Sequence, residues 1–210
     1  MADIKFIRSL RDRLKLPLPG WEAQRILIPE GRESGFRLDN LHPAAVLIAL
    51  YPERDEWYFP LIQRSIDGFA HSGQIALPGG RREGLESNIE TALREAEEEV
   101  SLPATEMEIL GETSPLPIPV SRHLVQPVIG FIKRKPKLVP DPKEVAHIFS
   151  VSLDTLLRVE PKLETREIKG RSWEIPYFEV EGHKVWGATA MILSEFREII
   201  SKLNLTSSNS

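Results

Sequence analysis

The spacing of apolar residues predicts a helix near the N-terminus. Four of them recur every three or four positions with arginine and lysine between them, and they are Ile4, Ile7, Leu10 and Leu14. This spacing places them on one side of a helix. Residues 16–20 contain two prolines and a glycine, which is typical of a segment that ends a helix. Residues 21–42 are polar and aperiodic, and we expect an extended arm there.

Apolar runs of strand length follow. Residues 44–51 form one run and residues 56–63 a second, and the turn chemistry at 52–55 predicts that the two pair as a hairpin. Pro60 cannot donate a backbone hydrogen bond, so we expect the second strand to lie at an edge or to be bulged. Further strands are predicted at 74–77, where residues 78–80 break the strand, and at 107–110, 124–132, 145–151 and 173–180.

Two helices are predicted later in the chain. Residues 87–100 have the clearer period, with apolar residues on one side at Ile89, Ala92, Leu93, Ala96 and Val100. Ser87 is a suitable N-cap, and Glu90 three residues later completes a capping box. The last helix is predicted near 188–203, and the polar residues after it are expected to be disordered. Strands and helices do not alternate regularly, which favours a mixed sheet flanked by helices.

The composition excludes several classes of function. The chain has no cysteine, so disulfides, thiolate catalysis and cysteine-ligated zinc are excluded. A net charge of −4 argues against binding nucleic acid, which usually requires a basic excess. No apolar run approaches the ~20 residues that span a bilayer, and no signal-peptide pattern is present. We therefore expect a cytoplasmic protein that acts on neither nucleic acid nor membrane.

Three carboxylates share one face of the helix at 87–100. Glu95, Glu98 and Glu99 have i, i+3, i+4 spacing, roughly 115° round the helix from its apolar stripe. Their mutual repulsion would be offset by a hard cation such as Mg²⁺, which carboxylate oxygens bind. A solvated acidic face is the alternative, and it is the usual meaning of a glutamate run. The glycine turn upstream, together with Glu86 and Arg94 at fixed offsets, favours the metal site.

Residues 80–102 resemble the Nudix box, G-x5-E-x7-R-E-U-x-E-E-x-G-U, in which U is apolar. Every charged position agrees. Ser101 replaces the final glycine, a position where a helix commonly ends with positive φ. The resemblance implies a Nudix-type α/β/α sandwich with a mixed β-sheet, of α+β or α/β class. It also implies hydrolysis of a nucleoside diphosphate linked to another group, with Mg²⁺ or Mn²⁺ as cofactor.

The same resemblance implies a role for each box residue. The implied metal ligands are Glu95, Glu98, Glu99 and the carbonyl of Gly80. Arg94 would orient the glutamates through ion pairs. Two candidates for the catalytic base remain open, Glu98 and Glu144, of which Glu144 could equally be a plain loop carboxylate.

Residues 61–80 resemble a more selective signature, that of the coenzyme A pyrophosphatase branch, roughly L-L-T-x-R-S-x3-R-x3-G-x3-F-P-G-G. Residues 127–130, 141–145 and 185–190 resemble this branch as well, so that the likeness extends over about 44–200. Two positions depart from it, Phe69 in place of arginine and Leu77 in place of phenylalanine. Phe69 removes a cation that could meet a phosphate. The candidates to replace it are Arg64, Arg81, Arg82 and Arg122, although a plain surface arginine is the commoner meaning of each.

The branch implies a substrate and a set of contacts. Coenzyme A or its thioesters would be cut to 3′,5′-ADP and 4′-phosphopantetheine. The expected substrate-binding residues are Arg64, Ser65, His71, Gly79 and Arg81. Phe69 keeps ADP-ribose, NADH and nucleotide sugars open as alternatives. A Nudix-fold binding protein without turnover is a third reading, against which stands the complete set of box carboxylates.

The expected organisation is an N-terminal helix and arm at 1–35, a Nudix hydrolase domain at 36–204 and a disordered tail at 205–210. The expected partner is a small nucleotide substrate. The assembly is left open, a homodimer being one option.

Overall fold

The computed structural model describes residues 4–29, 40–65, 73–168 and 170–203. Phe69, His71 and the predicted disordered tail lie outside these residues. The main sheet has eight strands: β1 (His42–Glu53), β2 (Glu56–Arg64), β3 (Ile75–Ala76), β4 (Gly79–Arg81), β5 (Glu108–Glu112), β6 (Leu116–Ile118), β7 (His123–Phe131) and β8 (Val145–Ser152). A second sheet has three strands: β9 (Lys162–Ile168), β10 (Arg171–Val180) and β11 (His183–Trp186).

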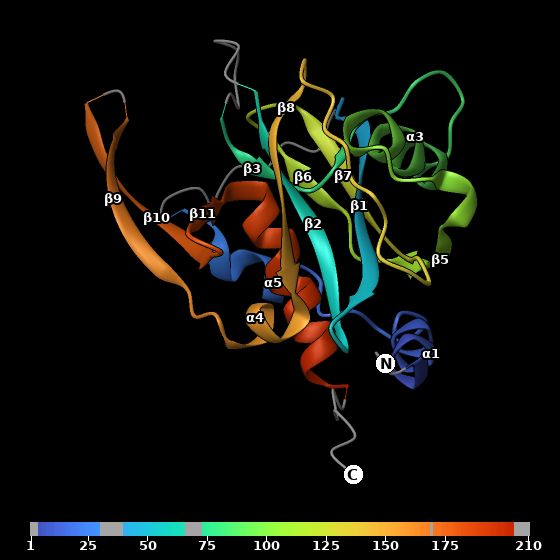
Figure 1. Cartoon of the computed structure of the whole chain (residues 1–210). Helices are drawn as coiled ribbons and strands as arrows, with labels where there is room; N and C mark the ends of the chain where they lie inside the picture. The colour runs from blue at the N-terminus through green and yellow to red at the C-terminus, as the bar shows by residue number, and fades with distance from the viewer. Residues whose placement is uncertain (1–3, 30–39, 66–72, 169, 204–210) are drawn as a thin grey trace.

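Helices flank the main sheet (Figure 1). They are α1 (Ile4–Arg13), α2 (Trp21–Gln24), α3 (Asn88–Val100), α4 (Leu153–Arg158) and α5 (Gly187–Ser201), with two short 3₁₀ turns at Arg25–Leu27 and Ala104–Glu106. The sheet is mixed, because β1 runs parallel to β7 and antiparallel to β2 and β4. The predicted mixed sheet flanked by helices is therefore confirmed. No helix in the described part of the chain is long and apolar enough to cross a membrane.

Strand β1 is apolar without alternation because both of its faces are covered. Ala44, Ile48 and Leu50 belong to the core cluster that includes α5. Ala45 and Leu47 belong to a second cluster, which includes the apolar side of α3. The two helices thus lie on opposite faces of the sheet, and the continuous run at 44–51 follows from this sandwich.

Strand β2 corrects one expectation. It is not an edge strand, because Pro60 lies opposite Ser150 of β8 while β1 and β3 pair with β2 on its other side. The pairing with β1 reaches only to Tyr58, and the pairing with β3 begins at Ile62. Pro60 falls in the gap between them, where no amide donor is required. A register shift does occur in β2, between Gln63 and Arg64.

The segment after the first helix is not an extended arm throughout. Residues 21–27 form α2 and a 3₁₀ turn, and Ala23, Gln24 and Leu27 are buried. The Ser194 Oγ of α5 donates a hydrogen bond to the Ala23 carbonyl at 2.7 Å. Tertiary contacts of this kind stabilise turns that sequence period alone does not indicate. Side chains from both sides of residue 35 share the core with α5, and the domain boundary placed there stays a prediction.

The expected break at 78–80 is only partly correct. Gly79–Arg81 forms β4, which pairs with Ala44, Ala45 and Val46 of β1. A Cβ on Gly79, whose φ is +151°, would lie 2.3 Å from the Ala45 carbonyl oxygen. Only glycine permits so close an approach of the two backbones.

Candidate active site

Helix α3 begins and ends as its sequence indicates. The Ser87 side chain accepts a hydrogen bond from the Glu90 amide, and the Glu90 side chain accepts one from the Ser87 amide, so the capping box is complete. At the other end Ser101 has φ 56° and ψ 34°, the left-handed conformation expected of the glycine it replaces. Its amide donates to the Glu97 carbonyl at 3.0 Å. Both ends of α3 are therefore capped, and the positions of its carboxylates relative to the sheet are fixed.

Arg94 links the carboxylates of the box. Its guanidinium makes two hydrogen bonds to Glu86, at 2.7 and 3.1 Å, and one each to Glu95 and Glu98, both at 3.0 Å. It also donates to the carbonyl of Arg81 at 3.0 Å, which fixes β4 to the helix. The Arg94 hydrogen bond, together with the backbone amide of Glu83, lowers the pKa of Glu86 to about 2. Glu86 therefore stays ionised and holds Arg94 in place.

Glu99 is the most enclosed carboxylate of the helix, with only 2% of its surface exposed. It accepts a hydrogen bond from the Gly79 amide at 2.8 Å and lies 3.4 Å from the Arg64 guanidinium. Burial raises the pKa of Glu99 to about 7, although the Gly79 amide opposes that shift. The register of β2 shifts between Gln63 and Arg64, and strand irregularities of this kind are common next to active sites.

Gly80 lies against the Glu95 carboxylate. A Cβ on Gly80 would come within 2.4 Å of the carboxylate atoms of Glu95. Burial raises the pKa of Glu95, the hydrogen bond from Arg94 opposes the rise, and the charges of Glu98 and Glu144 add to it. The carboxylates of Glu98 and Glu144 are thus close enough to repel that of Glu95.

Glu144 is brought to this group by the segment between β7 and β8. The Asp141 amide donates to the Glu99 carbonyl at 2.9 Å, which ties the segment to the end of α3. The Glu144 carbonyl accepts from the Ser65 amide at 2.9 Å. The side chain of Glu144 is exposed, and its charge contributes to the raised pKa of Glu99 as well as of Glu95.

The carboxylates suit a divalent cation chemically, although their present partners are protein groups. Within the described ranges, no group of three or more histidine or acidic side chains is already arranged around a metal position. Glu95 and Glu98 bind Arg94, and Glu99 binds the Gly79 amide. An all-oxygen donor set is what Mg²⁺ and similar hard cations prefer. The raised pKa values of Glu95 and Glu99 mark negative charge that such a cation would stabilise.

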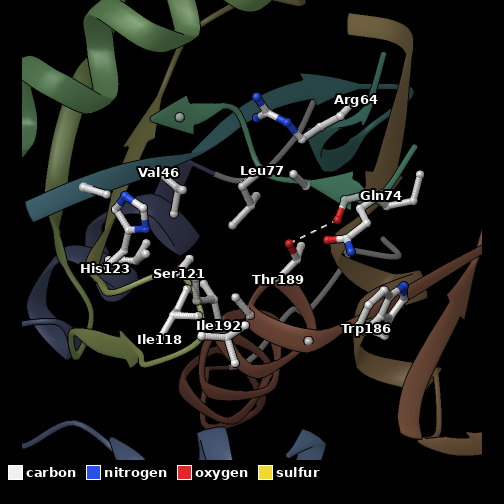
Figure 2. Close-up of a pocket in the computed structure, with 18 of the residues that line it drawn as sticks. Val46, Arg64, Gln74, Leu77, Ile118, Ser121, His123, Trp186, Thr189 and Ile192 are labelled. Carbon is white, nitrogen blue, oxygen red and sulfur yellow. Dashed lines mark hydrogen bonds between the residues drawn. The ribbon is translucent and has the colours of Figure 1, made fainter. Parts of the chain in front are cut away.

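A cavity of about 560 Å³ opens on the sheet face opposite α3 (Figure 2). Its walls come from β1, β4, β7, the second sheet and the beginning of α5. In Figure 2, His123 and Ser121 lie on one side of the cavity and Trp186 on the other. The Thr189 hydroxyl, at the start of α5, donates to the Ile75 carbonyl at 3.2 Å and joins that helix to β3.

The cavity meets the carboxylates at β4. Gly79 and Gly80 line the cavity, while the amide of Gly79 bonds to Glu99 and Gly80 packs against Glu95. Because neither glycine has a side chain, one strand of backbone separates the cavity from the acidic edge. A ligand held in the cavity would therefore lie one strand away from the carboxylates.

The predicted substrate contacts divide into three groups. Arg64, Gly79 and Arg81 line the cavity. Ser65 is not among the lining residues, and its hydroxyl donates instead to the Pro142 carbonyl at 3.4 Å. His71 lies outside the described residues.

Sequence reasoning did not assign several cavity residues. They are His123 on β7, Trp173 on β10, Trp186 on β11 and Thr189 on α5. The signal available for Trp186 and Thr189 was their place in the 185–190 likeness. His123 and Trp173 stand in strands without a motif, and only the folded chain brings them to the cavity.

Comparisons with known proteins identify the family of the chain. A family model described as "NUDIX domain" matches residues 41–177. The "Uncharacterized Nudix hydrolase NudL" of Photorhabdus laumondii is 33% identical over 163 residues, which cover 76% of this chain and 86% of that protein. The protein of the same name in Pectobacterium atrosepticum is 39% identical over 149 residues, which cover 67% of this chain and 74% of that protein. "Nudix hydrolase 15, mitochondrial" of Arabidopsis thaliana is 36% identical over 161 residues, covering 71% and 55%.

Solved structures support the fold. The Nudix hydrolase RenU from M. smegmatis superposes with a TM-score of 0.54 at 20% identity, covering 83% of this chain and 94% of that one. The MutT protein from Methanosarcina mazei Go1 gives 0.50 at 19% identity, covering 77% and 96%. The family model spans more than half of the sequence, and this chain therefore belongs to the NUDIX domain family of hydrolases.

Proposed function

We propose that the chain hydrolyses the diphosphate bond of coenzyme A or its thioesters, with Mg²⁺ or Mn²⁺, to give 3′,5′-ADP and (acyl-)4′-phosphopantetheine. One observation supports this substrate. Segments that resemble the coenzyme A branch lie far apart in sequence, yet Arg64, residues 74–77, Gly79, Gly80 and residues 186–189 contribute to one cavity beside the carboxylates. Its volume of about 560 Å³ is within the usual range for small-molecule sites.

The nucleotide half of the substrate fits the cavity by its chemistry. Trp173 and Trp186 add aromatic surface on which a base could pack, although the Arg166 guanidinium lies over the Trp186 ring at 4.9 Å. Arg81 offers a cation to a phosphate. The diphosphate would then pass Gly79 and Gly80 to the edge where Glu95 and Glu99 lie. The pantetheine arm would extend from this edge away from the cavity.

The protein groups at the edge position the reaction. Glu95, Glu98 and Glu99 would hold a divalent cation, which would offset the diphosphate charge and acidify the attacking water. Arg94 fixes the orientation of the glutamates through its ion pairs. The water oxygen forms a bond to one phosphorus while the bond from that phosphorus to the bridging oxygen breaks. The water proton goes to a carboxylate, and the second phosphate leaves with the bridging oxygen.

Two carboxylates can accept the proton. Glu98 is exposed at 60% and bonded to Arg94, whereas the Glu144 side chain is exposed in the segment anchored to α3. Glu98→Gln and Glu144→Gln separate them. Activity should fall toward low pH, where the base becomes protonated, and this fall should disappear in the variant that lacks the base while the other variant keeps it.

The test is product analysis. Purified protein is incubated with coenzyme A and either Mg²⁺ or Mn²⁺, and the products are separated. We expect 3′,5′-ADP and 4′-phosphopantetheine in equal amounts, and no turnover in Glu99→Gln. Absence of 3′,5′-ADP with both metals would remove coenzyme A as the substrate.

A second substrate class is supported by Phe69, which replaces an arginine of the branch signature. ADP-ribose, NADH and nucleotide sugars also contain a diphosphate but no 3′-phosphate. Ranking all of these against coenzyme A by kcat/KM decides between the classes. Coenzyme A in first place would reject the second class.

A further inference from the structure

Arg81 and His123 form a polar pair in the wall of an otherwise largely apolar cavity. They come from β4 and β7, strands that both pair with β1, where Arg81 lies opposite Ala44 and His123 lies in register with His42. The Arg81 Nε donates a hydrogen bond to the His123 Nε2 at 2.9 Å. That nitrogen must carry a lone pair to accept it, so the imidazole in this arrangement is neutral.

The charge of Arg81 is not balanced by a neighbouring acid in the described part of the chain. Arg64 and Arg94, the cations at the acidic edge, both pair with glutamates of α3. Arg81 makes no such ion pair with a described residue, and none of these residues accepts a hydrogen bond from its two Nη groups. As far as the described residues go, four N–H donors of a permanently charged group are therefore available at the cavity wall.

A phosphate ester matches this pair. The arginine fork binds two phosphate oxygens at once, and charge-assisted bonds of this kind are stronger than neutral ones. Ser121, which also lines the cavity, adds a hydroxyl near His123. Arg81 is one residue, or about 3.3 Å of strand, beyond the glycine that contacts Glu95. The bound phosphate would thus lie near the diphosphate and yet be a separate group.

We propose that Arg81 and His123 form a subsite for a phosphomonoester carried on the nucleotide half of the substrate. This rests on the proposed function, under which that group is the 3′-phosphate of coenzyme A. The subsite supplies a cation in a chain whose sequence has Phe69 in place of the signature arginine. It explains how a chain with this replacement could still select the phosphorylated ribose.

Direct binding measurements test the subsite. Isothermal titration with Mg²⁺ compares 3′,5′-ADP with 5′-AMP, neither of which has a diphosphate bond to be cleaved. Wild-type protein should bind 3′,5′-ADP at least about tenfold more tightly, the effect of one charge-assisted hydrogen bond. Arg81→Gln should lower the affinity for 3′,5′-ADP nearly to that for 5′-AMP. The affinity for 5′-AMP itself should stay nearly unchanged. His123→Leu should also reduce the ratio of the two affinities, but by a smaller factor than Arg81→Gln.

Arg82→Gln is the matched control. It removes the same charge one residue away, but the Arg82 guanidinium bonds to the Asn88 side chain and does not line the cavity. This variant should keep the preference for 3′,5′-ADP. Circular dichroism and thermal melting establish whether each variant is folded. If Arg81→Gln does not fold, His123→Leu takes its place as the test variant.

Three results would overturn the subsite. Equal affinity or no binding of both nucleotides by wild-type protein would show that no such subsite exists. A preference retained in Arg81→Gln would place it elsewhere, and equal losses for both nucleotides would assign Arg81 to the 5′-phosphate. These results are distinct from failure of the proposed function, since preference for 3′,5′-ADP without cleavage of coenzyme A would leave the subsite standing.

Discussion

At the scale of single residues, two adjacent glycines have different reasons to be glycine. A Cβ on Gly79 would meet the backbone of β1, with Ala45 O at 2.3 Å and Val46 Cα at 2.5 Å. A Cβ on Gly80 would meet the far end of the Glu95 side chain instead. Backbone cannot move aside cheaply, whereas a side-chain carboxylate can.

The two alanine variants should therefore separate stability from activity. Gly79→Ala is expected to lower the free energy of unfolding by at least about 2 kcal/mol, through overpacking and backbone strain. Gly80→Ala should cost less than about 1 kcal/mol of stability but displace Glu95, and a misplacement of this size can lower kcat about 100-fold. Urea denaturation and turnover of coenzyme A measure the two effects. The reverse pattern would contradict this account of β4.

Glu99 makes stability depend on pH when no cation is bound. Its pKa in the folded protein is about 7 against an ordinary value of 4.5, so the folded state binds a proton more tightly than the unfolded state does. The stability that this proton contributes is complete below the unfolded pKa of 4.5 and is lost as pH rises through 7.

We expect the metal-free protein to lose up to about 3 kcal/mol of stability relative to Glu99→Gln between pH 4.5 and 8. Denaturation curves in a chelating buffer at a series of pH values give this difference. Adding Mg²⁺ at pH 8 should restore stability to the wild type and not to the variant. Parallel curves for the two proteins would show that burial does not perturb Glu99.

At the scale of elements, a buried carboxylate joins three segments that are far apart in the sequence. Glu195 of α5 is fully buried and accepts hydrogen bonds from the Gly20 amide at 3.0 Å, the Ser114 amide at 3.3 Å and the Gln24 side chain at 2.8 Å. The N-terminal segment, α5 and the connection from β5 to β6 are thereby held together.

Removing this acceptor should destabilise the fold. Glu195→Ala leaves three donors without a partner, at about 1 kcal/mol or more each, so we expect a loss of about 3 kcal/mol. Glu198→Ala, on the exposed side of the same helix, should change stability by less than about 0.5 kcal/mol. Urea denaturation of both variants measures the contrast. Similar losses of stability in the two variants would mean that the hydrogen bonds of Glu195 do not hold the three segments together.

The sequence predicts those elements whose signals are local. The capping box of α3, the period of α1 and the apolar run of β1 each lie within a dozen residues, and the structure contains all three. The strand β9 was not predicted, because its alternating charges pair across the sheet, as in Lys162–Glu179 and Glu164–Lys184, and give it no apolar face. Helix α2 was not predicted, because Gly20 offers no side-chain cap and Glu195, 175 residues away, binds its amide.

The candidate site divides in the same way. The glutamates and Arg94 share one helix, so spacing alone brings them together. The cavity cannot be found by spacing, since His123, Trp173 and Trp186 stand on strands of two different sheets. Long-range strand pairing places them, and no local pattern encodes it.

At the scale of the whole molecule, the cavity provides an intrinsic reporter of binding. Two of the four tryptophans, Trp173 and Trp186, line it, whereas Trp57 is in the core against Phe6 and Phe131. Coenzyme A added in a chelating buffer should change the tryptophan fluorescence without being cleaved. The change should disappear when Trp173 and Trp186 are both replaced by phenylalanine, and persist in Trp57→Phe. A signal retained in the double variant would place the ligand outside the cavity.

The meeting of cavity and carboxylates at Gly79 and Gly80 also sets an order of events after cleavage. Under the proposed binding mode, the nucleotide half of coenzyme A would leave through the cavity mouth, while the half at the acidic edge would depart directly into water. We therefore expect 3′,5′-ADP to leave last and to compete with fresh substrate for the same space. Turnover would then slow as this nucleotide accumulates, so that the enzyme would be subject to competitive inhibition by its own product.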